Sequence, residues 1–132
     1  MNSSAAALAE FASRRAADLD VATVVLPVVY GDATRALSAA IAETRPAAVV
    51  ALGQANGRDR VTVERVALNR YVCNHVFYGL MHLIATERPD LRGGFVHVPC
   101  LPEQVTATDG PSMGLDTLAQ AVDVVVRTAA ER

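Results

Sequence analysis

Apolar residues fall along the chain in two kinds of run that alternate from one end to the other. Short apolar runs occupy residues 21–26, 47–52 and 95–98, and longer stretches with apolar residues three or four positions apart separate them. The short runs predict buried strands, and the longer stretches predict amphipathic helices. This alternation is typical of an α/β fold with a largely parallel central sheet.

The boundaries of these elements follow from capping residues, glycines and prolines. A further run at residues 61–68 alternates between apolar and polar positions, which predicts one more strand. The expected helices cover residues 2–17, 31–45 and 73–87, with a last one capped by Pro111 and Ser112. The third of these is apolar on most faces and should be largely buried.

Length and charge restrict the class of protein. A chain of 132 residues is long enough for one domain, and we expect a single domain over residues 1–132. The formal net charge is −2, with no block of basic residues, so a nucleic-acid-binding surface is not expected.

Cysteine content and hydropathy point to a cytoplasmic protein. The chain has 2 cysteines, which cannot form a disulfide framework. Its first residues do not resemble a secretory signal, and no apolar run is long enough for a membrane span. We therefore expect a cytoplasmic protein with free thiols at Cys73 and Cys100.

Chemically capable side chains stand where such a sheet places its sites. Ligand sites of parallel sheets lie outside the carboxyl ends of the strands. Gln54 and His97 fall at the ends of predicted strands, and Cys73 begins the third predicted helix. Glu64 lies nine residues before Cys73.

Thiol, imidazole and carboxylate together are the groups that a cysteine hydrolase uses. Unpaired backbone N–H groups and the positive end of a helix dipole would favour the thiolate of Cys73. His97 could take the thiol proton and later protonate a leaving amine, while Glu64 holds the imidazole in one tautomer.

Structural roles are alternatives for the same residues. A buried cysteine is commonly a small hydrophobic residue, His97 could be a hydrogen-bonded core histidine, and Glu64 could pair with Arg60 or Arg65. His75 and His82 are expected to make local contacts on their helix. A zinc site is a competing possibility, formed by the set Cys73, His75, His97 and Cys100.

Around these residues the chain resembles pyroglutamyl-peptidase I, also called pyrrolidone-carboxylate peptidase. The resemblance runs through nearly the whole chain, and the stretches that carry it are residues 26–30, 52–55, 63–69, 71–80, 92–99, 101–104 and 111–113. It implies a cysteine peptidase that removes N-terminal pyroglutamate from peptides, without a cofactor. The family's catalytic glutamate, cysteine and histidine fall on Glu64, Cys73 and His97.

The resemblance also implies a fold, an assembly and a pocket. The fold is a three-layer α/β/α sandwich with a mostly parallel twisted sheet, and the assembly is a homo-oligomer, a tetramer or a dimer. The pocket for the neutral lactam ring would involve Val28, Gln54, Tyr71 and Val72.

Two parts of the family pattern are missing. An N-terminal strand with an aromatic-containing loop is absent, and a central segment is absent between Asn69 and Tyr71. The domain is therefore expected to be truncated relative to the family. Two hypotheses follow: a shortened but active peptidase, or a catalytically inactive remnant that serves as a folded or partner-bound module.

Overall fold

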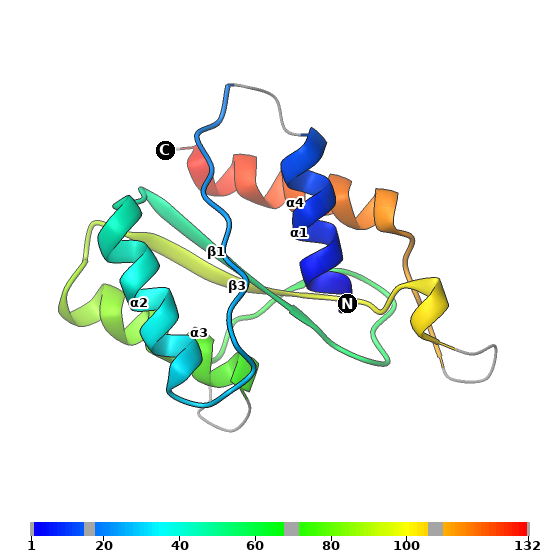
Figure 1. Ribbon diagram of the computed structural model, residues 1–132, viewed down its shortest axis with the longest axis horizontal. Coiled ribbons are helices and arrows are strands. Elements are labelled where there is room, and N and C mark those ends of the chain that lie inside the picture. Colours follow the sequence, from blue (N-terminus) through cyan, green and yellow to red (C-terminus); the bar gives the residue numbers. More distant parts are fainter. Residues whose placement is uncertain (1, 15–17, 68–71, 106–109, 132) are drawn as a thin grey trace.

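Helices cover both faces of a small central sheet (Figure 1). The computed structural model describes residues 2–14, 18–67, 72–105 and 110–131. The helices are α1 (Ser3–Arg14), α2 (Asp32–Thr44), α3 (Val72–Thr86) and α4 (Leu115–Ala130), and the strands are β1 (Ala48–Gln54), β2 (Thr62–Val63) and β3 (Arg92–Val98). A short 3₁₀ helix, η1 (Pro102–Gln104), follows β3.

The sheet of the described residues is mixed, with the strand order β1-β3-β2. β1 and β3 run parallel and pair along their whole length, from Ala48 opposite Arg92 to Gln54 opposite Val98. β2 is antiparallel to β3 and pairs Thr62 with His97. α3 lies in the connection between these two strands. Because β1 and β3 run parallel, their carboxyl ends lie at the same end of the sheet.

Two apolar clusters fix the three layers. On one face, α2 and α3 bury Leu37, Phe77 and Leu80 against Phe95 of β3. On the other face, α1 and α4 pack around the next strand position, Val96. Successive side chains of a strand point to opposite faces, so β3 contributes to both clusters and joins them. The predicted α/β/α sandwich is confirmed.

The predicted helices are confirmed, with small changes at their ends. α3 begins at Val72, one residue before the predicted start, and α4 begins at Leu115, just after the predicted cap. The part of the first predicted helix beyond Arg14, residues 15–17, lies outside the described residues. None of the helices in the described ranges is long and apolar enough to cross a membrane.

The strand predicted at residues 21–26 is wrong. This segment is extended but joins no ladder, and Val25 is 74% exposed. Val21 packs against the α1–α4 cluster, whereas Leu26 packs against the α2–α3 cluster. Each apolar cluster thus receives a side chain from this segment, as it would from a strand, but the described backbone of the segment joins no ladder.

The strand predicted at residues 61–68 is much shorter than expected. Only Thr62 and Val63 form a strand, and the backbone N–H of Glu64 donates a further bond of 2.9 Å to the carbonyl of Phe95. β2 lies at the edge of the sheet and has one neighbour, so nothing holds the chain extended once it leaves β3. Residue 68 lies outside the described residues.

Candidate active site

The carboxyl ends of β1 and β3 bring a glycine next to a histidine. Gly53 of β1 is the register partner of His97 in β3. Paired residues of neighbouring strands share a face, and so do residues two apart on one strand. His97 therefore lies on the face of Phe95, whose ring centroid is 4.9 Å from the His97 ring. This is the face that α2 and α3 cover.

Glu64 contacts the imidazole of His97 directly. Nδ1 of His97 is 2.6 Å from Oε1 of Glu64, and both side chains are largely buried. β2 makes this contact possible, because it pairs with β3 and delivers Glu64 opposite Phe95. When Nδ1–H donates to the carboxylate, Nε2 is the nitrogen that can accept a proton. The contact thus selects the tautomer that a general base requires.

Arg58 is a second partner of the same carboxylate. Its Nη1 lies 2.9 Å from Oε1 of Glu64. The hydrogen bond from His97 is the main cause that lowers the pKa of Glu64 below its ordinary value; the positive charge of Arg58 adds to it, and partial burial opposes both. Glu64 is therefore ionised at neutral pH.

Cys73 reaches the same end of the sheet from α3. It is the second residue of that helix. A methyl group placed on Gly53 would lie 2.9 Å from the sulfur of Cys73, so the thiol rests against the glycine that pairs with His97. The described structure thus brings Cys73, His97 and Glu64 to one face at one end of the sheet.

The expectation of a thiolate favoured by its position on the helix is corrected by the structure. Cys73 does lie at the start of α3, but burial raises the pKa of its thiol and outweighs a backbone hydrogen bond that lowers it. In this half-buried place the loss of hydration disfavours the charged form of the thiol, whereas the helix end favours it.

Three of the four residues expected to form a pocket are in the described part of the chain. Val72 packs against the α2–α3 cluster, beside Cys73 in sequence. Val28 is 78% exposed in the segment before α2. Tyr71 lies outside the described residues.

The side chain of Gln54 holds the start of α1. Its Oε1 accepts a hydrogen bond of 2.7 Å from the backbone N–H of Ser3, and its Nε2 lies 3.1 Å from Oδ1 of Asn56 and 3.3 Å from the sulfur of Cys100. Cys100 is buried and also contacts Asn56. Gln54 follows Gly53 on β1, so its side chain points to the face of the sheet opposite Cys73, where α1 lies.

The residues of the alternative zinc site do not form a set of ligands in the described structure. Within the described ranges, no three His, Cys, Asp or Glu side chains come together in a way that could hold a metal ion. Cys100 instead contacts Gln54 and Asn56, and the ring of His75 lies 5.3 Å from the ring of Tyr30.

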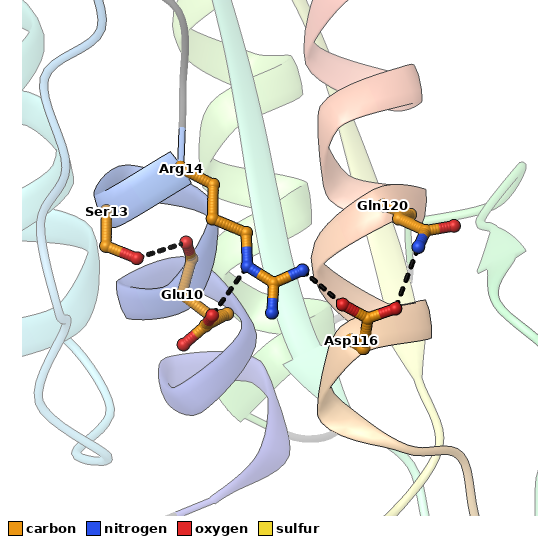
Figure 2. Close-up of polar contacts among 5 residues, drawn as sticks. All are labelled: Glu10, Ser13, Arg14, Asp116 and Gln120. Carbon is orange, nitrogen blue, oxygen red and sulfur yellow. Dashed lines mark hydrogen bonds and ion pairs between the residues drawn. The ribbon is translucent and has the colours of Figure 1, made fainter.

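A groove of about 450 Å³ lies between α1 and α4, away from Cys73. Figure 2 shows the guanidinium of Arg14 reaching from α1, where it contacts Glu10, to Asp116 on α4. Arg127, at the other end of the groove, pairs with Asp123 and Asp18. Because its arginines are already neutralised, the groove is a contact between two helices rather than a site for charged ligands.

Sequence reasoning did not single out Arg58 or Gly53. Arg58 lies in an irregular loop, where no periodicity marks a residue that faces a site. Gly53 directly follows a predicted strand, and the sequence does not indicate which side chains pack around it. The close packing of Cys73 and Phe95 around Gly53 is visible only once the strands are paired.

An α/β/α sandwich with a thiol, an imidazole and a carboxylate at the carboxyl end of its parallel strands has the parts of a cysteine hydrolase. The pyroglutamyl peptidase family model matches the chain in two stretches, residues 1–70 and 68–132. The chain belongs to the pyroglutamyl peptidase family. The two stretches meet where the sequence predicts a missing central segment, between Asn69 and Tyr71.

Individual relatives agree with this assignment. The chain is 34% identical over 168 positions to a pyrrolidone-carboxylate peptidase of Streptomyces coelicolor, covering 86% of this chain and 78% of that protein. The chain is also 32% identical over 158 positions to the pyrrolidone-carboxylate peptidase of Brevibacillus brevis, covering 78% of this chain and 74% of that protein. The structure is similar to the crystal structure of pyroglutamyl peptidase I from Bacillus amyloliquefaciens, with a TM-score of 0.93, 26% identity, and coverage of 100% of this chain and 89% of that one.

Proposed function

We propose that this protein is a cysteine peptidase that removes N-terminal pyroglutamyl residues from peptides. Cys73 is the nucleophile, His97 the general base and acid, and Glu64 the residue that orients His97. The observation that carries the proposal is the 2.6 Å contact between Glu64 and His97 on the face where Cys73 packs against Gly53. Membership of the pyroglutamyl peptidase family supplies the substrate class.

The reaction begins with an uncharged thiol. His97 takes the Cys73 proton at Nε2 as the sulfur attacks the carbonyl carbon of the pyroglutamyl residue, which forms a C–S bond. The tetrahedral intermediate collapses, the C–N bond breaks, and the imidazolium gives its proton to the leaving amine. Water, activated by His97, then hydrolyses the thioester and restores the thiol. Glu64 stays ionised throughout and stabilises the imidazolium.

Recognition of the lactam would come from a few apolar and polar contacts, because the ring is neutral. The resemblance assigns these contacts to Val28, Gln54, Tyr71 and Val72. The Nε2 of Gln54 already has two partners, Asn56 and Cys100, and its Oε1 accepts one bond from Ser3. An amide oxygen accepts twice, so Oε1 can accept one further bond from a ligand.

Hydrolysis of a pyroglutamyl-aminocoumarin tests the proposal. The wild-type protein should release the fluorophore, and Cys73→Ser should lose at least about a thousandfold of this activity, the scale at which removal of a nucleophile acts. Prolyl-aminocoumarin, which has the same ring without its carbonyl group, is the matched control and should not be cleaved. Folded wild-type protein without turnover, or a Cys73→Ser variant as fast as wild type, contradicts the proposal.

The shortened, inactive remnant is the second candidate function. The observation that favours it is the raised pKa of Cys73, because a thiol kept for catalysis is commonly activated. Under this alternative the protein is a folded or partner-bound module. The same assay separates the two candidates: a folded protein that fails to release the fluorophore is the expected result for the remnant.

We further propose that the protein is a homo-oligomer that acts in the cytoplasm. Five large apolar side chains between residues 24 and 30 are about half exposed or more, which is unfavourable for a monomer in water: Val24, Val25, Val28, Val29 and Tyr30. Both cysteines are free, as expected in a reducing compartment.

A further inference from the structure

We propose that Arg58 is a positioning residue for the reaction, one that holds the Glu64 carboxylate in the orientation in which it meets His97. The inference rests on the proposed function, since it assigns a role within that site. Arg58 would not touch the substrate; it acts through Glu64.

One nitrogen of the Arg58 guanidinium, Nη1, has two partners. Nη1 lies 2.9 Å from Oε1 of Glu64 and also donates a hydrogen bond to Oγ1 of Thr62. Thr62 is the register partner of His97 across the β2–β3 ladder. The arginine is therefore fixed by the strand residue that lies directly beside the histidine.

Arg58 and His97 donate to the same oxygen of Glu64. A carboxylate with one donor can turn about its last side-chain bond, whose torsional preference is broad. Two donors that approach one oxygen from a loop and from β3 restrict this rotation. Charge-assisted hydrogen bonds of this kind are short and about twice as strong as neutral ones.

Arg58 also adds a positive charge that opposes proton uptake at the site. The groups that face Glu64 are Arg58 from the loop before β2 and His97 from β3, with the Cys73 thiol on α3 across Gly53. Arg60, the other arginine of that loop, pairs with Asp59 and its side chain is 75% exposed. Arg58 is thus the arginine of this loop whose charge acts on Glu64, although its own partial exposure weakens the effect.

Arg58→Met tests the role, with Arg60→Met as the matched control. Arg58→Met should lower kcat by roughly ten- to a hundredfold, because a displacement of about 1 Å can cost about a hundredfold in rate. Its acid-side midpoint in the pH profile of kcat/KM should move to higher pH, since a proton joins the Glu64–His97 pair more readily without the guanidinium. Arg58→Lys should keep the midpoint near the wild-type value, and Arg60→Met should match wild type in both quantities.

A measurement that needs no peptidase activity separates the two proposals. The ¹³C signal of the Glu64 carboxyl group should titrate at higher pH in Arg58→Met than in wild type. If the wild type lacks activity but this shift is present, the proposed function fails and the contact stands. If wild type is active and Arg58→Met behaves like Arg60→Met in rate, pH profile and ¹³C titration, the inference is overturned.

Thr62→Val replaces Arg58→Met if that variant does not fold, because it removes only the hydrogen bond that anchors the guanidinium. It should give a smaller loss of kcat than Arg58→Met. An unchanged rate in Thr62→Val would then overturn the inference.

Discussion

The thiol of Cys73 experiences two opposing electrostatic influences. As the second residue of α3 it lies near unpaired N–H groups, which favour a negative charge. Its packing against Gly53 removes water from the sulfur, and this loss of hydration raises its pKa. Because burial works against the thiolate, the proposed mechanism assigns activation of the thiol to His97.

Alkylation by iodoacetamide should report this balance. Burial raises the pKa of the Cys73 thiol above the ordinary value of a cysteine. Little of the thiol is then ionised at pH 7, and the reaction rate should keep rising beyond about pH 8.5, the ordinary value.

Cys73→Ser is the control for this measurement, because it leaves only Cys100, which is 3% exposed and should react slowly. Modification that reaches its full rate below pH 8 would mean that the helix end dominates over burial.

The junction of β1, β3 and α3 is the element-scale feature on which the site depends. Gly53 is the point where all three meet: it pairs with His97, and Phe95 and Cys73 fill the space where a side chain would stand. A Cβ at this position would lie 2.8 Å from the ring of Phe95, which is buried in the α2–α3 cluster and cannot easily move.

Gly53→Ala should therefore destabilise the protein and displace the thiol of Cys73, the proposed nucleophile. We expect a loss of about 1–3 kcal/mol in the free energy of unfolding, the usual cost of an added methyl group in a packed core. Urea denaturation measures the loss, and the aminocoumarin assay should show a lower kcat. Gly94→Ala in β3 is the matched control, because a Cβ there meets nothing within 4 Å, and it should change stability by no more than about 1 kcal/mol. Equal stabilities for the two variants would refute the packing argument.

Elements that carry their own pattern were predictable from the sequence. The apolar character of α3 placed Cys73 at a helix start, and the runs of β1 and β3 placed Gln54 and His97 at strand ends. The three-layer arrangement followed from the family resemblance and is confirmed by the two apolar clusters.

Features that depend on long-range pairing were not predictable. Residues 21–26 have the composition of a strand and send a side chain to each apolar cluster, yet their backbone joins no ladder of the described sheet. The contact of Arg58 with Glu64 depends on how an irregular loop returns to β2. The raised pKa of Cys73 depends on how closely α3 packs on Gly53, which the helix position alone does not indicate.

At the scale of the whole molecule, the chain keeps the family's layers on a small sheet. The alignment with the Brevibacillus brevis protein runs over 158 positions, more than the 132 residues of this chain, so it contains long gaps in this sequence. In the described structure β1 is an edge strand, and the segment after α1 exposes several valines. Exposed strand edges and apolar side chains favour association with another chain.

Light scattering coupled to size exclusion should consequently give a mass that is a multiple of 13.9 kDa. Val25, 74% exposed, is the position where a charge should disturb this association, and Val25→Asp should lower the mass toward that of the single chain. Val124→Asp on α4 is the matched control, because this valine is 63% exposed on a different element. A wild-type mass of one chain at micromolar concentration would contradict the oligomer. If Val124→Asp dissociates as readily as Val25→Asp, the interface is not specific to the segment before α2.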